Sequence, residues 1–154
     1  MKIAVVGTGC VGLVPGARLA DVGNRVVCLV SDATKIATLK ASGIRIHELK
    51  SKSNSLVRAN AAAGRLRLTL DVDLAVRHVR VQSIAAGAPL AEDGAMDANC
   101  VLAAARSIGT RMDSPHVATN ESTVSVGTAS RVREEVARTF AAPPSTPTIQ
   151  SRLT

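Results

Sequence analysis

The segment Lys2-Ile3-Ala4-Val5-Val6-Gly7-Thr8-Gly9-Cys10-Val11-Gly12 places three glycines, spaced Gly-x-Gly-x-x-Gly, directly after a short apolar run. The apolar run predicts a buried strand, and the glycines predict a tight turn into a helix whose N-terminus faces an anion. In this interpretation Gly7 allows the turn, Gly9 lets backbone N–H groups approach a pyrophosphate, and Gly12 lets the helix pack closely on the strand. Because turns need glycine for their own reasons, a purely structural strand-turn-helix is the alternative.

The composition predicts one folded domain with an aliphatic core. The chain has 154 residues, of which 46% are hydrophobic, and its aromatic content of 1% is the single Phe140. This length suffices for one genuine core, and the hydrophobic content excludes a chain that is disordered throughout.

The charge is strongly positive. Nineteen Lys and Arg against twelve Asp and Glu give a formal net charge of +7. A basic surface can meet nucleic acid, an anionic membrane or a phosphorylated ligand. The basic residues are dispersed along the sequence, with no basic arm and no aromatic platform for stacking bases. We therefore expect a solvated arginine-rich surface, with neither nucleic acid nor membrane as a partner.

The cysteines and histidines predict no metal site. Cys10, Cys28 and Cys100 are odd in number and fit no metal-ligand spacing, and the three histidines are scattered. Free thiols are typical of a reducing compartment. No apolar run is long enough for a membrane span and no signal segment opens the chain, so we expect a cytoplasmic protein.

The first helix is predicted over residues 10–22. Its apolar stripe is Val11, Val14, Pro15, position 18 and Val22, which places Arg18 near the centre of the face that lies on the sheet. A buried unpaired guanidinium is costly, and an interior proline costs about 3 kcal/mol. These two residues argue against a comfortably packed first helix.

Strands and helices are predicted to alternate along the rest of the chain. The expected strands are 25–30, 66–70, 80–86 and 116–119. The expected helices run from Ser31 or Asp32 to Gly43, over 56–63, over 71–76, from Asp97 through Ile108, and over 127–140, with a serine-rich loop at 48–55. This alternation predicts an α/β fold, a Rossmann-like, doubly wound, mostly parallel sheet with helices on both faces. Residues 1–140 form the expected domain, and residues 141–154 have the composition of a disordered tail.

The chain resembles the N-terminal NAD-binding domain of the UDP-glucose 6-dehydrogenase family of nucleotide-sugar dehydrogenases. The resemblance runs from Met1 to about Phe140. It is carried by MKIAVVGTGCVGLV, Lys35-Ile36-Ala37, Gly43-Ile44 with Glu48, Gly64-Arg65-Leu66, Ile84-Ala85-Ala86-Gly87-Ala88-Pro89, Glu92-Asp93-Gly94 and Ser122-Thr123-Val124-Ser125-Val126-Gly127-Thr128. It implies NAD as the cofactor and oxidation of UDP-glucose to UDP-glucuronate with two NAD.

The resemblance also implies the residues that hold the cofactor. Gly7, Gly9, Val11 and Gly12 match the family's pyrophosphate loop. Lys35 matches a basic residue near the adenosine end, and Thr123 matches the threonine beside the nicotinamide half. The family's catalytic cysteine and sugar-nucleotide domain are expected beyond Thr154, so we expect no catalytic residue in this chain and no UDP-glucose binding without that domain.

Several positions depart from the family pattern. The acidic residue that ends the second strand and binds the ribose hydroxyls is Val30, which has no acceptor. The family's Gly-Thr-Pro threonine is Ala88, and its Lys-Ser-Thr lysine is Glu121.

Two hypotheses follow from these matches and departures, and nucleic-acid binding through the positive charge is a third hypothesis. The first is an NAD-binding domain that is incomplete as an enzyme, with oligomerisation open. The second is a degenerate, non-catalytic module for nucleotide binding or association. A change to NADP is less favoured, because no arginine directly follows Val30 to receive a 2′-phosphate.

Overall fold

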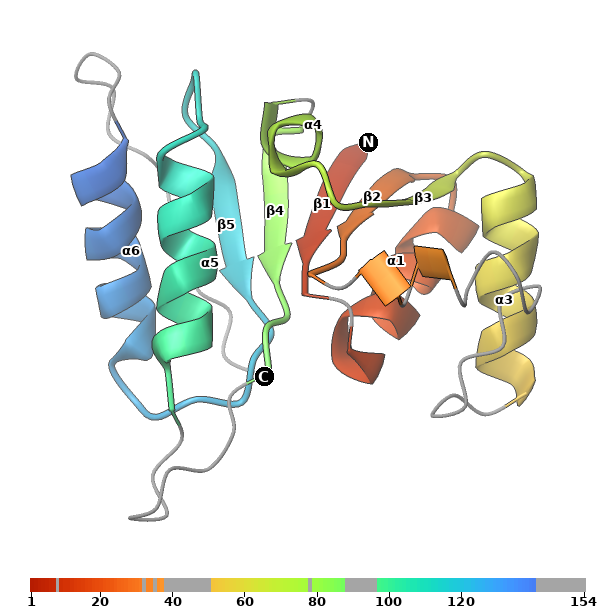
Figure 1. Cartoon of the computed structure of the whole chain (residues 1–154), viewed down its shortest axis with the longest axis horizontal. Helices are drawn as coiled ribbons and strands as arrows, with labels where there is room; N and C mark the ends of the chain where they lie inside the picture. Colours follow the sequence, from red (N-terminus) through yellow and green to blue (C-terminus); the bar gives the residue numbers. More distant parts are fainter. Residues whose placement is uncertain are drawn as a thin grey trace.

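The computed structural model describes residues 1–7, 9–31, 33–34, 36–37, 51–77, 79–87 and 97–140, without the side chains of residues 10, 11, 51 and 52. Five strands and five helices with assigned bounds alternate along this part of the chain (Figure 1). They are β1 (Lys2–Val6), α1 (Cys10–Asp21), β2 (Arg25–Leu29), α3 (Ser51–Ala62), β3 (Leu66–Thr69), α4 (Val72–Arg77), β4 (Val81–Ile84), α5 (Asn99–Gly109), β5 (Val117–Asn120) and α6 (Thr128–Thr139).

The strands form one parallel sheet in the order β3-β2-β1-β4-β5. The chain moves outward from β1 to β3 and then returns to the other side of β1 with β4. In a parallel sheet all carboxyl ends meet at one edge, and a ligand crevice opens where the strand order reverses. That point lies between β1 and β4. The predicted fold class is confirmed.

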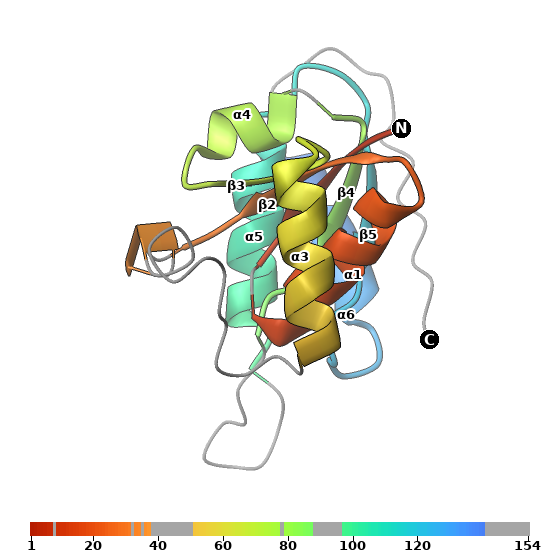
Figure 2. The ribbon, with the colours of Figure 1, turned by 90° about the vertical axis from the view of Figure 1, so that its right-hand side faces the viewer.

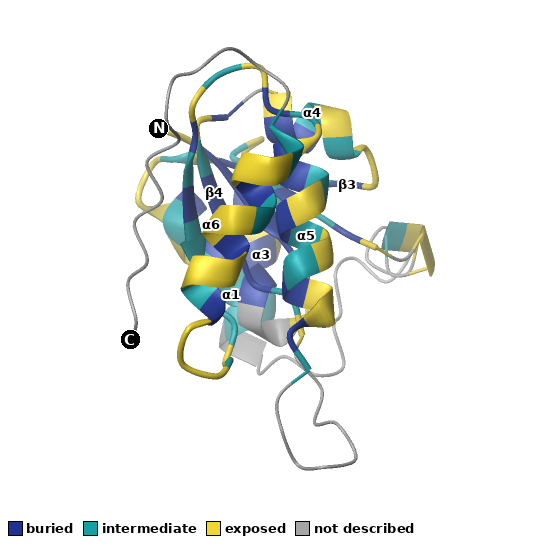
Figure 3. Cartoon of the chain, turned by 90° about the vertical axis from the view of Figure 1, so that its left-hand side faces the viewer, coloured by how far each residue is buried: buried dark blue, intermediate teal, exposed yellow. Residues whose placement is uncertain are grey.

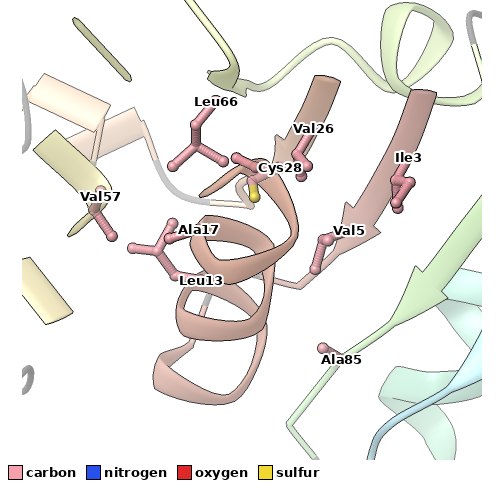
Figure 4. Packing of buried hydrophobic residues seen from close by; sticks show 10 residues of the cluster. Ile3, Val5, Leu13, Ala17, Val26, Cys28, Val57, Leu66 and Ala85 are labelled. Carbon is pink, nitrogen blue, oxygen red and sulfur yellow. The ribbon is translucent and has the colours of Figure 1, made fainter. Parts of the chain in front are cut away.

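Two aliphatic cores cover the two faces of the sheet. On one face α1 packs over the odd-numbered residues of β1, α3 packs beside α1 and against β3, and Leu13, Ala17 and Val57 meet there in Figure 4. On the other face α5 packs beside α6, and Val101, Ile108, Val132 and Val136 share one apolar cluster with Ile84. Figure 2 shows α3 and α1 from outside the first layer, whereas Figure 3 shows the α5 and α6 layer with its exposed outer face.

The prediction for the buried face of α1 is wrong. Arg18 is exposed, Val14 and Pro15 are half-buried, and Val22 is 77% exposed. The face on the sheet is instead built from small residues and one leucine: Gly12, Leu13, Gly16, Ala17 and Ala20. The helix runs unbroken through Pro15. The buried guanidinium and its cost therefore do not arise.

The remaining elements follow the predictions closely, with one further error. α3 begins at Ser51, so residues 51–55 of the predicted serine-rich loop are helical. Asp71 caps α4, since its Oδ1 accepts a hydrogen bond from the Leu74 N–H at 3.0 Å. Most of the helix predicted up to Gly43, and the tail at 141–154, lie outside the described residues. No helix among the described residues is long and apolar enough to span a membrane.

Candidate functional site

The turn after β1 is built on two glycines that touch each other. Gly7 has φ +105°, a conformation that L side chains rarely adopt, and its N–H donates to the Leu29 carbonyl at 3.3 Å. A Cβ on Gly12 would lie 1.9 Å from the Gly7 carbonyl oxygen. The first turn of α1 can therefore approach the end of β1 only because neither residue carries a side chain.

The end of β4 closes the other side of this turn. A Cβ on Gly7 would lie 2.5 Å from the carbonyl oxygen of Ala85, which is itself buried. The Ala85 N–H donates to the Val6 carbonyl at 2.8 Å, so the two strand ends are locked together. A Cβ on Gly12 would also lie 3.1 Å from the Ala85 Cβ, so the first turn of α1 packs closely on the end of β4.

Gly9 has a different environment from Gly7 and Gly12. A Cβ added to Gly9 would meet none of the atoms that the structure describes within 4 Å, and its backbone is extended, with φ −68° and ψ −178°. Gly9 is the N-cap of α1, and the cap has no side-chain hydrogen bond and no acidic residue in the first turn. The first N–H groups of a helix lack intrahelical acceptors and carry partial positive charge. The open space at Gly9 therefore faces donors that suit a phosphate.

The loop after β5 reaches the same edge of the sheet. The Glu121 N–H donates to the Ile84 carbonyl at 2.8 Å, and the Ser122 hydroxyl donates to the same oxygen at 3.4 Å. Thr123 follows, with an exposed side chain. Since β4 separates β5 from β1, Thr123 follows a strand whose axis lies about 10 Å from that of β1. The sequence does not predict this anchoring role of Ser122, which lies two residues after the end of β5.

The end of β2 offers no polar side chain at Val30. The Val30 N–H donates to the Thr69 carbonyl at 2.8 Å, and its side chain is 2% exposed. A valine side chain accepts no hydrogen bond, so this position cannot hold a ribose hydroxyl. The described residue beside it with a hydroxyl is Ser31, which is exposed.

Some predicted positions lie outside the description. These are Lys35, Asp32 and Ala88, together with the side chain of Val11, whose backbone lies in the first turn of α1. The structure thus brings Gly7, Gly9 and Gly12 together and places Thr123 at the same edge of the sheet.

Other reactive side chains among the described residues lie apart from this edge or are inert. Burial raises the pKa of the Cys28 thiol to about 12, so it stays protonated as a small core residue. His116 is buried, with Nδ1 2.8 Å from Nε2 of Gln82, and burial lowers its pKa. In the part of the chain that the structure describes, no group of three or more His, Cys, Asp or Glu residues could hold a metal ion.

Comparison with curated proteins gives relatives of one kind. The chain is 42% identical over 135 residues to UDP-glucose 6-dehydrogenase TuaD of Bacillus subtilis, which covers 88% of this chain and 29% of the relative. It is 41% identical over 140 residues to UDP-glucose 6-dehydrogenase of Rhizobium meliloti, covering 90% of this chain and 32% of the relative. The chain therefore spans about 30% of the length of these relatives.

Solved structures with the same fold include a UDP-glucose dehydrogenase from Pyrobaculum islandicum. It has a TM-score of 0.85 and 28% identity, and the match covers 97% of this chain and 34% of that one. A GDP-mannose dehydrogenase from Pseudomonas aeruginosa shares the fold with a TM-score of 0.88 over 98% of this chain and 35% of its own. Residues 1–144 match the model of the UDP-glucose/GDP-mannose dehydrogenase family, NAD binding domain. The chain belongs to the UDP-glucose/GDP-mannose dehydrogenase family and corresponds to its NAD-binding domain.

Proposed function

We propose that this chain binds NAD across the carboxyl edge of the sheet, with the pyrophosphate on the turn between β1 and α1. The observation that carries the proposal is the contrast among three glycines. Gly7 and Gly12 have no room for a Cβ, whereas Gly9 has open space in front of the uncapped N-terminus of α1. A close approach between backbone and pyrophosphate needs this open space.

The proposed roles of the other residues follow from their positions. Gly7, Gly9 and Gly12 form the loop, and the backbone N–H of Val11 lies at the uncapped N-terminus of α1. Thr123 stands on the loop after β5, toward the nicotinamide half, and Lys35 is proposed for the adenosine end. When bound, NAD supplies the hydride acceptor; the residues of this chain bind and orient it.

We further propose that the activity served is oxidation of UDP-glucose to UDP-glucuronate, carried out by a longer protein of which this chain supplies the cofactor domain. The two relatives named above support this substrate. Of the two described free cysteines, Cys28 is buried and protonated and Cys100 is exposed on α5. We propose neither for the covalent step, which we assign to the rest of the longer protein. We expect no UDP-glucose-dependent NADH formation by this chain alone, and clear turnover would contradict that expectation.

The competing function is a degenerate module that no longer binds NAD, and Val30 is the observation that favours it. Calorimetric titration of the chain with NAD separates the two. A dissociation constant in the micromolar range supports the cofactor domain, and no detectable binding supports the degenerate module. A parallel titration with NADP tests the change of cofactor, and we expect weaker binding there.

A pair of variants locates the site. Gly9→Ala adds a methyl group where the structure has open space, so the unfolding midpoint should stay unchanged while NAD affinity falls by about tenfold or more, the loss expected for one or two hydrogen bonds. Ala103→Ser adds one atom at an exposed position of α5 and serves as the matched control. Equal affinity in the two variants would contradict a pyrophosphate at Gly9.

A further inference from the structure

The edge of the sheet opposite the proposed NAD site carries a row of basic residues. Each of the five strands is preceded or begun by one, and the strand order places them side by side. In the order β3-β2-β1-β4-β5 they are Arg65, Arg25, Lys2, Arg80 and His116.

The register of the sheet aligns this row. Lys2 is paired with Arg25, and the pairs Val26 with Leu66, Ile3 with Val81 and Val81 with Val117 follow one residue later. The five basic residues therefore share one level of the sheet, about 4.8 Å apart from strand to strand. The charges look dispersed in the sequence, but the parallel topology gathers them at its amino edge, where the N label stands in Figure 1.

The central cations of this row are unpaired. Lys2, Arg25 and Arg80 are exposed and have no ion-pair partner among the described residues, and neither has the exposed Arg18 in the last turn of α1. The ends of the row are engaged, because Arg65 donates to Asn60 Oδ1 at 2.9 Å and His116 is buried.

Carboxylates also lie near this edge. Asp73 pairs with Arg77 and Arg111. Asp21 Oδ1 accepts a hydrogen bond from the neutral Asn60 amide at 3.3 Å, and Asp113 lies beside His116, so these two carboxylates keep their charge. The four exposed cations outnumber them, and the edge keeps a net positive charge.

Two apolar side chains project at the same edge. The turn between α1 and β2 begins with Val22, 77% exposed, and Met1 is 75% exposed. The Arg25 N–H donates to the Met1 carbonyl at 2.8 Å, which places Met1 directly beside the cations. Of the four large hydrophobic residues exposed in the described part of the chain, two thus lie at the basic edge.

We propose that this amino edge, defined by Lys2, Arg18, Arg25 and Arg80 with Val22 at its tip, is a docking surface for an anionic phospholipid membrane. Juxtaposed cations attract acidic headgroups, and exposed apolar side chains enter the headgroup boundary. A nucleic-acid backbone would use the cations but would leave Val22 without a role. The surface is independent of the NAD site because it lies at the opposite edge of the sheet.

Sedimentation with vesicles tests the proposal. The probes are vesicles of phosphatidylcholine alone and of phosphatidylcholine with about one third phosphatidylserine, at about 0.1 M salt. The chain should sediment with the anionic vesicles and release from them at about 1 M salt, where the Debye length is about 3 Å. Each cation near an anionic surface contributes about a fivefold change in partitioning, so Arg25→Glu with Arg80→Glu should lower binding by about 25-fold or more.

Matched variants separate the edge from the net charge. Arg58→Glu with Arg133→Glu reverses two exposed charges on α3 and α6 that have no ion-pair partner in the described part of the chain, and this pair should retain most of the binding. Val22→Ala should weaken binding to anionic vesicles by about threefold or more and leave any binding to duplex DNA unchanged.

Three results would overturn the proposal. The first is no binding of the unaltered chain to anionic vesicles, and the second is an equal loss in the two charge-reversed pairs. The third is retention of duplex DNA that depends on Arg25 and Arg80 without binding to vesicles, which would mark a nucleic-acid surface instead.

Discussion

The turn after β1 and the end of β2 lie on neighbouring strands but differ in what their residues supply. At the turn, a Cβ on Gly12 would collide with the Gly7 carbonyl oxygen at 1.9 Å, and a Cβ on Gly7 would collide with the Ala85 carbonyl oxygen at 2.5 Å. At the end of β2, Val30 contributes a buried apolar side chain and an N–H bonded to Thr69. The turn has the backbone arrangement that suits a phosphate, whereas the end of β2 lacks the hydrogen-bond acceptor that a ribose hydroxyl needs.

The difference shows that the fold requires the glycines of the turn but does not require an acidic residue at the end of β2. The glycines are required by the packing of α1 on β1 and β4, so they persist for structural reasons whether or not a ligand binds. An acidic residue at the end of β2 has no structural role of this kind, because Val30 packs there without one. The presence of the glycine turn therefore does not indicate how tightly the chain binds NAD. The residue at position 30 is more informative about NAD affinity.

The largest effect is expected from Gly12→Ala. Helix propensity alone favours alanine over glycine by about 1 kcal/mol. The added Cβ, however, would lie 1.9 Å from the Gly7 carbonyl oxygen, which backbone movement must relieve at a cost of about 3 kcal/mol or more. Urea unfolding should therefore show a lower free energy of unfolding, and calorimetric titration should show that NAD binding is lost. Unchanged stability would show that α1 is not held as closely as the structure has it.

Val30→Asp should move stability and affinity in opposite directions. A carboxylate at a position that is 2% exposed is costly to bury, so the free energy of unfolding should fall by about 2 kcal/mol. Two hydrogen bonds to ribose hydroxyls should strengthen NAD binding by about tenfold or more. Urea unfolding and calorimetric titration of the same preparation measure both effects.

Val30→Thr is the control for this substitution. Threonine has nearly the shape of valine and adds one hydroxyl, so it tests the polar group without the charge. We expect a smaller loss of stability and little gain in affinity. A gain equal to that of aspartate would contradict a bidentate role for the carboxylate, and no gain in either variant would place the ribose elsewhere.

The order of elements could be predicted from the sequence, because buried strands are marked by short aliphatic runs and helices by caps such as Asp71. The buried face of α1 could not, since it consists of Gly12, Gly16, Ala17 and Ala20 around Leu13, and small residues give a weak hydrophobic period. The polar composition of Ser51–Ser55 predicts a loop, whereas the structure has these residues as the start of α3.

Parts of the candidate site could also be predicted from the sequence, and other parts could not. The glycine turn could be located because its spacing is local, and Thr123 because its motif resembles the family's. The contacts that unite them, from Gly7 to Ala85 and from Ser122 to Ile84, join segments far apart in the sequence and depend on the strand order. The basic row was missed for this reason, since residues as distant as Lys2 and Arg80 become neighbours only through the register of β1 and β4.

The smallest expected effect is on stability in acid. It arises in the layer formed by α5 and α6, away from the glycine turn and from Val30. Hydrogen bonds from Arg138 and Arg106 lower the pKa of Glu135 from 4.5 to about 2. Because the folded pKa lies below the unfolded one, the stabilisation is present above pH 4.5 and is lost as the pH falls toward 2. Glu135→Gln should flatten this part of the pH profile in urea unfolding, while Glu134→Gln, at an exposed neighbour without an ion pair in the described residues, should leave its slope unchanged. An unaltered slope in Glu135→Gln would assign the acid sensitivity to another group.

The hydrogen bond between Arg106 and Glu135 joins α5 to α6 and does not involve Gly9 or Val30. NAD affinity measured near neutral pH should therefore be the same in both variants.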